Sequence, residues 1–401
     1  MKLRFRFGKV ESNSHYQDAQ LATIDAQLDE QKIRNRLALS YKGLKTGLGR
    51  KPIDPVIGYK AHLLYFLKRD IISFNELPRQ IQKDSDYQAF CRCQGVAFTA
   101  SYLSRFRECH LTGEVAAQLH RDILSNLSLE TETAPLRIGI WDSVPMPSYS
   151  TPVKDTRHCE CQDPCECERH FSDPDATIGW QRPTPTKKDK FIGYRKHTVV
   201  LYSADKDQRL PIATAVCPAN EADIDAIEQA LCQCSKLIDI LLVDQAIYDF
   251  EQITDWLTRF GVLVLVKPKS NAVLDGYPLD ETKTPCCPEM SQPLVWSHLD
   301  FSDHTHVYRC GVLDCIHQFN CPRQFEIPMA EQPAVLGVFP PHTRWGRLLV
   351  ALRGLIEPEF GVQTLWTRLK RLPFRGFKAF ALLGQLCDTT RLLAKLASAP
   401  T

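Results

Sequence analysis

The hydrophobic pattern of the chain changes near residue 135. Between residues 55 and 110, apolar side chains recur at helical spacing, as in PVIGYKAHLLYFLKRDIISF, and this predicts helices. Later apolar runs predict strands, namely LRIGIWDS, FIGYRKHTVVLYSA, QRLPIATAVCPAN, IDILLVDQAIYD and VLVLVKPK. Helical segments follow the third and fourth of these runs (EADIDAIEQALCQCSK and YDFEQITDWLTRFG). Strands that alternate with helices predict an α/β fold, with a mixed sheet and helices on its faces.

Four regions follow from this pattern. We expect a polar, partly helical N-terminal arm, a helical region, an α/β region in two segments, and an inserted β subdomain rich in proline and cysteine. Two helices close the chain, over residues 344–371 and 375–397. The four regions span residues 1–54, 55–134, 135–269 together with 341–401, and 270–340, respectively.

The helical region has the outline of a DNA-binding motif. Its first helical pattern breaks at Gly95, and a short helix then opens at Thr99 or Ser101, residue types that cap helices. This helix carries Arg105 and Arg107. Helix, turn and basic helix is the order of a helix-turn-helix, so we expect both arginines to contact DNA. A plain helical hairpin would give the same pattern.

Charge is distributed unevenly along the 401-residue chain. The net charge is only +2, and 44% of the residues are apolar, which is typical of a globular protein. Residues 1–110 nevertheless carry +8 and residues 341–401 carry +7, whereas the middle carries −13. Basic ends suit contact with a polyanion, and an acidic middle suits the binding of cations. Ordinary variation among solvated surfaces explains the pattern equally well. No apolar run is long enough to predict a membrane span.

The sixteen cysteines favour thiols and metal sites over disulfides. The start, MKLRFRFGKVES, is basic but lacks the apolar stretch of a signal peptide, so we expect a protein of the reducing cytoplasm. The segment HCECQDPCECERH spaces four thiols closely enough to bind Zn²⁺, at Cys159, Cys161, Cys165 and Cys167. A second, irregular set is a candidate for either zinc or buried thiols, at Cys286, Cys287, Cys310, Cys315 and Cys321.

Two aspartates share a local setting: Asp142 and Asp244 each end an apolar strand run and precede a turn. The carboxyl ends of neighbouring strands are where open sheets place their sites. Two carboxylates brought together there favour a hard cation such as Mg²⁺ or Mn²⁺. Such ions can activate an attacking oxygen and stabilise a leaving oxygen at phosphorus. An aspartate at a strand end is more often a turn or helix cap, and sequence order alone does not show that the acids converge.

A third acid is expected from the segment ALRGLIEPEFG, which contains Glu357 and Glu359. Glu357 lies four residues after Arg353, a spacing that places both side chains on one face of a continuous helix. The arginine could neutralise phosphate or orient the carboxylate. Glu357 is therefore the first choice, and Glu359 remains the alternative.

These segments, in this order, resemble the DDE transposases of bacterial insertion sequences. The matching words are GIWDS, SDPDATIGW, KFIGYRKHTVV, RLPIATAVCPANEAD, ILLVDQAIYD, RGLIEPEFG and RGFKAFALLGQL. The resemblance implies a ribonuclease-H-like catalytic domain, in which a mixed sheet has flanking helices and an inserted β subdomain. It also fits an N-terminal all-α domain of helix-turn-helix type in front of the catalytic domain.

The resemblance also implies a chemistry. Metal-activated water would nick DNA at the ends of the element, and the freed 3′-hydroxyl would attack target DNA. Asp142, Asp244 and Glu357 would hold Mg²⁺ or Mn²⁺. The family often has a tyrosine and a lysine near this glutamate, where the chain has Val350 and Thr364, and Lys370 would serve instead. The expected contacts to DNA come from Arg105, Arg107, Lys196, Arg353 and Lys370.

The expected partners are the element's ends and target DNA, bound by at least a dimer at the nucleoid, with no membrane involved. His197 could approach the DNA, although a strand histidine with satisfied hydrogen bonds is the simpler interpretation. Two other functions fit the same residues. One is a non-catalytic DNA-binding protein derived from a transposase, and the other is a plain metal-dependent nuclease.

Overall fold

The computed structural model describes the helical region, the α/β region and the β insertion, with gaps between them. The described residues are 5–7, 16–41, 51–71, 73–127, 136–151, 171–184, 187–203, 208–244, 250–266, 273–300, 302–303, 305–313, 315–317, 321–328, 339–366, 369 and 372–398. The side chains of residues 182–184, 187–188, 250 and 365–366 are outside this description.

The N-terminal part of the chain is a helical body built around α3. This helix is apolar on every side, and its residues from Pro55 to Phe66 are all buried, as expected for a helix at the centre of a body. Leu21, Ile24 and Leu37, from the part of the chain that we expected to form a separate arm, join the same core. The elements are α1 (Ala19–Ala26), α2 (Glu30–Ala38), η1 (Leu39–Tyr41), α3 (Pro55–Leu67), α4 (Leu77–Lys83), α5 (Ser85–Cys91), α6 (Ala100–Cys109) and α7 (Gly113–Ser125).

The start of α6 agrees with the sequence pattern. Gly95 has a φ of +75°, a conformation that glycine adopts without strain, and it separates α5 from α6. Thr99 is the N-cap of α6, and its hydroxyl accepts a hydrogen bond of 3.3 Å from the amide of Tyr102. The predicted break and the first of the two predicted caps are therefore confirmed.

The central sheet has the strand order β4–β3–β1–β5–β6, and β2 pairs with the first part of β3. The first three strands along this order are antiparallel, whereas β1, β5 and β6 run parallel. The sheet is therefore mixed, as predicted. The strands are β1 (Ile138–Pro147), β2 (Thr177–Thr184), β3 (Lys187–Ser203), β4 (Gln208–Pro218), β5 (Ile240–Val243) and β6 (Leu263–Val266).

Helices cover both faces of this sheet. The side chain of Thr214 on β4 contacts α12, whereas that of its neighbour Ala215 packs on Ala226 of α8, so these two helices lie on opposite faces. Helices α10 and α11 contact β1, and α12 also packs on α3 and α7, which joins the helical body to the sheet. The helices are α8 (Asp223–Cys234), η2 (Ser235–Leu237), α9 (Phe250–Phe260), α10 (Arg344–Arg353), α11 (Ile356–Trp366) and α12 (Phe377–Ser398).

Two predicted boundaries are wrong. The first strand does not end at Asp142, because β3 pairs with β1 along its whole length and carries it on to Pro147. The helix predicted over residues 344–371 is divided, because the amides of Gly354 and Leu355 bond to carbonyls three residues back and close a tight turn between α10 and α11.

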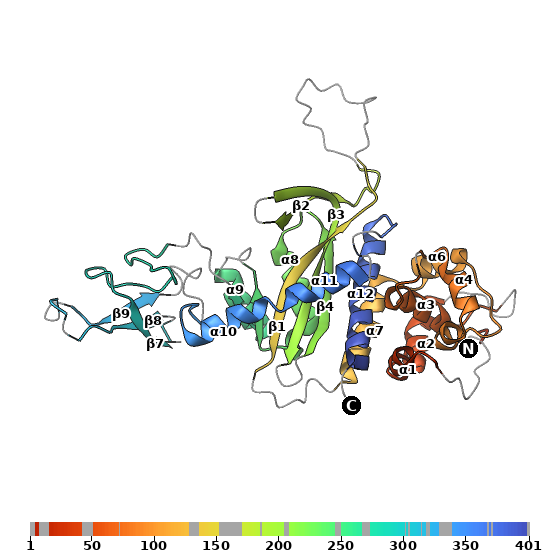
Figure 1. Cartoon of the computed structure of the whole chain (residues 1–401), viewed down its shortest axis with the longest axis horizontal. Coiled ribbons are helices and arrows are strands. Elements are labelled where there is room, and N and C mark those ends of the chain that lie inside the picture. Colours follow the sequence, from red (N-terminus) through yellow and green to blue (C-terminus); the bar gives the residue numbers. More distant parts are fainter. Residues whose placement is uncertain are drawn as a thin grey trace, which may run out of the picture.

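The insertion forms a three-stranded antiparallel sheet of β7 (Leu294–Asp300), β8 (Thr305–Cys310) and β9 (Gln324–Pro328). It has its own small core, which includes Cys287, Leu294 and Tyr308. Figure 1 shows the central sheet lying between the helical body and this insertion. Within the described ranges, no helix is both long enough and apolar enough to cross a membrane.

Candidate active site

The acids Asp142 and Asp244 lie at the same level of neighbouring parallel strands. In the register of β1 and β5, Ile138 faces Ile240 and Ile140 faces Leu242. The same offset places Asp142 level with Asp244, which directly follows the last residue of β5. Asp142 lies inside β1, but beyond the last residue of β1 that pairs with β5. The two aspartates therefore flank the point where β5 ends.

Arg353 links the two aspartates. Its Nη2 atom lies 3.1 Å from Oδ2 of Asp142 and 3.5 Å from Oδ2 of Asp244. Arg353 is the last residue of α10, and its side chain is only 17% exposed. One cation thus stands between two carboxylates at the carboxyl end of parallel strands, where neighbouring carboxylates favour a positive charge between them.

Glu357 lies near enough to Asp142 for its charge to act on that carboxylate. It is exposed in the first turn of α11. Burial raises the pKa of Asp142 to about 6, and the negative charges of Asp244 and Glu357 add to this, against Arg353 and the amide of Ser143. The predicted sharing of one helix face by Arg353 and Glu357 does not hold, because the break between α10 and α11 separates them.

Glu359 has different partners. Its carboxylate is 3% exposed and accepts hydrogen bonds from Arg391 at 2.6 Å and 3.1 Å, with Lys395 3.5 Å away. Both cations belong to α12, so this glutamate joins α11 to α12. Of the two candidates for a third acid, Glu357 is the one whose charge acts on Asp142.

The chemistry of these side chains fits a hard divalent cation, because carboxylate oxygens are the ligands that Mg²⁺ and Mn²⁺ favour. The guanidinium of Arg353 contacts two of them and offsets part of their negative charge. Within the described part of the chain, no three His, Cys, Asp or Glu side chains come close enough together to hold an ion as they stand.

This last finding argues against zinc, one of the two interpretations left open for the cysteines of the insertion. All five candidate cysteines are described, yet they do not gather around a common point. Cys286 and Cys287 are neighbours in an extended segment, where successive side chains point to opposite sides. Cys286 donates to the carbonyl of Thr284, and Cys287 packs in the small core of the insertion. The other predicted zinc residues, Cys159, Cys161, Cys165 and Cys167, lie outside the described residues.

Lys196 does not suit the DNA contact that we expected of it. Its side chain has no exposed surface, and its Nζ atom donates hydrogen bonds to Thr198 at 2.7 Å, Gln363 at 2.7 Å and Asp388 at 2.6 Å. A buried ammonium with three acceptors has neither the access nor the free donors for phosphate. Lys196 instead joins β3 to α11 and α12.

The two arginines of α6 occupy different environments. Arg105 is exposed, whereas Arg107 is half-buried, with its guanidinium 4.4 Å from the ring centre of Phe374 and 5.7 Å from that of Phe74. Arg107 thus packs the helical body against the segment before α12. Lys370 lies outside the described residues.

His197 is the buried strand residue of the simpler interpretation, but only one of its ring nitrogens has a hydrogen-bond partner, because Nδ1 finds none among the described residues. It is buried, its Nε2 atom lies 3.1 Å from Sγ of Cys217, and its ring stacks on Trp141. Burial lowers the pKa of His197 to about 3, so it is a neutral core residue at physiological pH.

The sequence reasoning missed the role of the SDPDATIGW segment. Asp173 is fully buried and accepts hydrogen bonds from Ser148 at 2.7 Å, from Tyr194 at 2.9 Å and from the amide of Gly376 at 2.9 Å. Asp175 accepts from the amide of Phe377 at 3.0 Å. These aspartates therefore hold the N-terminal end of α12, and the paired Asp residues of the motif were the available signal.

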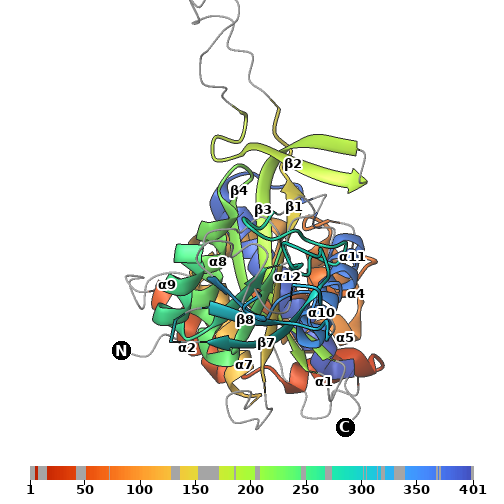
Figure 2. The ribbon, with the colours of Figure 1, turned by 90° about the vertical axis from the view of Figure 1, so that its left-hand side faces the viewer.

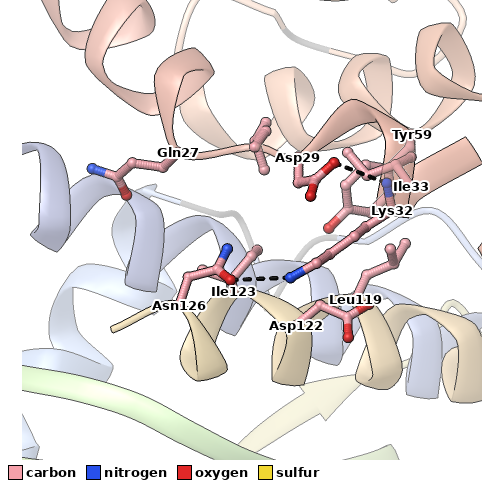
Figure 3. A pocket seen from close by; sticks show the side chains of 10 residues that line it. Gln27, Asp29, Lys32, Ile33, Tyr59, Leu119, Asp122, Ile123 and Asn126 are labelled. Carbon is pink, nitrogen blue, oxygen red and sulfur yellow. Dashed lines mark hydrogen bonds between the residues drawn. The ribbon is translucent and has the colours of Figure 1, made fainter. Parts of the chain in front are cut away.

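A small hollow lies in the helical body, away from the acids. Figure 3 shows Lys32 donating to Asn126, at 3.1 Å, across this hollow between α2 and α7. The hydroxyl of Tyr59 borders it and has no hydrogen-bond partner among the described residues. We see no catalytic constellation there, so the acids at the end of β5 are the candidate active site.

Two known protein families match the chain. Residues 9–109 match the family described as "Transposase domain (DUF772)", and residues 134–297 match the "Transposase DDE domain". The chain belongs to the insertion-sequence DDE transposases. Asp142 and Asp244 of the transposase lie within the second match, and Glu357 lies beyond its end. No curated protein in the comparison matches the chain.

Proposed function

We propose that this transposase cuts and joins DNA by metal-dependent phosphoryl transfer at Asp142, Asp244 and Glu357. The observation that carries the proposal is the shared contact of Arg353 with both aspartates, at 3.1 Å and 3.5 Å. It supports convergence of acids that are far apart in sequence at one end of the sheet. The raised pKa of Asp142 is a second sign of a site built to hold positive charge.

The strand arrangement supports a ribonuclease-H-like catalytic domain. Three antiparallel strands that are neighbours in the sheet, β1, β3 and β4, are followed along the chain by the parallel strands β5 and β6, with α8 and α9 in the connections. The hairpin of β2 and the β7–β9 sheet are additions to this arrangement. For α5 and α6 we retain the helix-turn-helix as a proposal, with the exposed Arg105 as its DNA contact.

Each residue of the site has a distinct part in the proposed reaction. The bound metal would supply Lewis-acid stabilisation of the attacking and leaving oxygens. Asp142 and Asp244 are the paired ligands, held level by the register of β1 and β5. Glu357 supplies the third carboxylate from its exposed position in the first turn of α11. Arg353 offsets part of the negative charge of the two aspartates and would contact phosphate in the complex with DNA.

The partners follow from this chemistry. The transposase binds the ends of its own element and a target DNA. Joining two ends requires at least two subunits on DNA. Lys370 remains a proposed phosphate contact, and Mn²⁺ is a proposed substitute for Mg²⁺. An enzyme of this kind works where the element's DNA lies, at the nucleoid.

A strand-transfer assay tests the proposal. It uses DNA with the two boundaries of the encoding element, in the presence of Mg²⁺ or Mn²⁺, and compares the parent with Asp142→Ala, Asp244→Ala and Glu357→Gln. Glu281→Gln, an exposed acid of the insertion, is the control. Joined products from the parent and the control alone support the proposal. Binding without cleavage in every sample would instead indicate a non-catalytic DNA-binding protein, and cleavage without joining a nuclease.

A further inference from the structure

A β-hairpin stands out from the end of the sheet that carries the acids. Beyond Gly193, towards its N-terminal end, β3 has left both β1 and β4 and pairs only with β2. Because β3 is antiparallel to β1, this end lies at the carboxyl end of β1. We call residues 177–192 of this hairpin, formed by β2 and the start of β3, the hairpin arm. Figure 2 shows it standing above the sheet.

The departure of the arm is fixed by the backbone. Gly193 has a φ of +152°, and a Cβ atom there would lie 2.4 Å from the carbonyl oxygen of Met146. Only glycine fits so close an approach. The arm is therefore set at a defined angle to β1, the strand that carries Asp142.

Arg195 ties the arm to the active site. Its Nη1 atom donates to the hydroxyl of Ser143, the neighbour of Asp142, at 3.3 Å, and its Nη2 atom donates to the carbonyl of Trp180 in the arm. The charge of Arg195 also lowers the pKa of Asp223, which is raised by burial and, in part, by Asp244. Arg195 therefore lies between the acids and the arm.

The arm presents an aromatic and basic surface. Trp180 and Lys190 face each other across β2 and β3, and the ammonium of Lys190 lies 4.8 Å from the ring centre of Trp180. Lys190 is exposed, and Trp180 is 43% exposed, which is unusual for so large an apolar ring. The sequence of the arm also contains Arg182, Lys187 and Lys188, against one acid, Asp189.

We propose that the hairpin arm is a DNA-holding surface, on which Trp180 and Lys190 contact the DNA beside the phosphate held at the acids. The proposal rests on the proposed function, because it takes DNA as the partner of the acids. Charge complementarity selects the partner: the exposed ammonium of Lys190, in a segment whose sequence holds four cations and one anion, attracts a polyanion. The indole supplies the flat apolar face that sugars and bases contact, and Arg195 is a positioning residue that holds the arm in place.

A binding experiment in EDTA tests the arm apart from catalysis. The probe is a fluorescent duplex that contains one boundary of the encoding element, titrated with the full chain over a range of salt concentrations. Trp180→Ala should weaken binding roughly 5- to 150-fold, the range for loss of an aromatic contact to nucleic acid. Trp180→Phe should restore part of this loss. Lys190→Gln should lower the slope of log affinity against log salt by about 1.

Two variants serve as matched controls. Leu257 on α9 is 44% exposed, close to the value for Trp180, and Lys236 is an exposed lysine at the opposite end of β5. Leu257→Ala and Lys236→Gln should bind as the parent does. Hydroxyl-radical footprints of Trp180→Ala should lose protection only at the nucleotides next to the cleavage point.

Parent-like affinity and footprint in Trp180→Ala and Lys190→Gln would overturn the proposal. A loss of self-association in these variants, measured by sedimentation without DNA, would also overturn the proposal, because the arm would then bind a second copy of the chain. The outcomes separate the arm from the catalytic proposal. If the arm variants bind DNA more weakly but the parent shows no strand transfer, the proposal for the arm is supported and the proposed reaction is contradicted. If the parent shows strand transfer but the arm variants bind DNA as the parent does, the proposed reaction is supported and the proposal for the arm is contradicted.

Discussion

The Nζ atom of Lys196 lies 2.6 Å from Oδ1 of Asp388, and neither side chain has any exposed surface. The pair joins β3 to α12, and the amide of Gln363 on α11 bonds to the same aspartate oxygen at 2.9 Å. The helix that carries Glu357 is therefore held to the sheet through a buried charge. Removal of one partner leaves the other charge without compensation in an apolar interior.

We expect Lys196→Met to lower the free energy of unfolding by about 3–5 kcal/mol, the range for breaking one side of a buried ion pair. Lys236→Met, which changes an exposed lysine, should stay within about 0.5 kcal/mol of the parent. The measurement is denaturant unfolding followed by circular dichroism. Equal stability of the two variants would mean that the buried pair does not form.

A second prediction concerns acid sensitivity. His120 is fully buried, with Nδ1 3.0 Å from the hydroxyl of Thr389 and Nε2 3.1 Å from the carbonyl oxygen of Pro211, and burial lowers its pKa to about 4. The unfolded chain, with an ordinary histidine pKa near 6.5, binds the proton more readily than the folded chain. The contribution of neutral His120 to the free energy of unfolding is therefore fully present above about pH 6.5 and is lost as the pH falls towards 4.

Replacement by Gln removes this titration. Between pH 6.5 and 4, the free energy of unfolding of His120→Gln should fall less than that of the parent, by about 3 kcal/mol. Denaturant unfolding at a series of pH values measures the difference. His298→Gln, which changes an exposed histidine of the insertion, is the control. Parallel pH profiles for the parent and His120→Gln would contradict a neutral buried His120.

The two glutamates of α11 should respond differently to the same substitution. Glu357→Gln should reduce DNA cleavage by about a hundredfold or more, because it removes a charge that acts where the reaction charge develops, without loss of stability. Glu359→Gln should mainly lower stability, because Arg391 and Lys395 lose their charged partner. Parallel cleavage and unfolding measurements on both variants distinguish them. The reverse pattern would make Glu359 the third acid.

The local hydrophobic pattern of the sequence was enough to predict the positions of the two candidate aspartates. The apolar runs before Asp142 and Asp244 predicted neighbouring strands, and that placement is what brings the two aspartates level. The roles of Lys196 and Glu359 could not be predicted in this way. Lys196 and Asp388 are 192 positions apart, and nothing in the surrounding residues indicates that α12 covers this part of β3. Burial by a distant helix decides whether a charged residue meets DNA or another side chain.

The break between α10 and α11 was missed for a similar reason. LRGLIEPEF contains residues compatible with one helix, including a proline in a position that helix starts tolerate. In the structure that proline, Pro358, lies in the first turn of α11. It was a signal for a new helix start, but the spacing from Arg353 to Glu357 favoured continuity. The arginine reaches the aspartates because α10 ends beside β1 and β5.

The last prediction concerns the competition between Arg353 and metal ions. In the absence of DNA, the guanidinium already offsets part of the negative charge of Asp142 and Asp244, so an arriving divalent ion must displace a bound cation or tolerate its repulsion. Arg353→Ala should therefore bind Mn²⁺ about tenfold more tightly than the parent. In free energy this change is a modest part of the interaction between two unit charges about 4 Å apart at a partly buried site. The same variant should bind DNA less tightly, because it lacks the proposed phosphate contact.

Titration of Mn²⁺ followed by electron paramagnetic resonance measures this affinity directly. Arg344→Ala, which removes an exposed arginine from the first turn of the same helix, should leave Mn²⁺ affinity unchanged. Asp142→Ala should abolish the tight binding in both backgrounds, which shows that the ion is bound at the acids. Unchanged Mn²⁺ binding in Arg353→Ala would mean that the arginine does not compete with the ion, since removal of a competing cation can only strengthen binding there. Weaker binding would mean that the arginine supports the metal site.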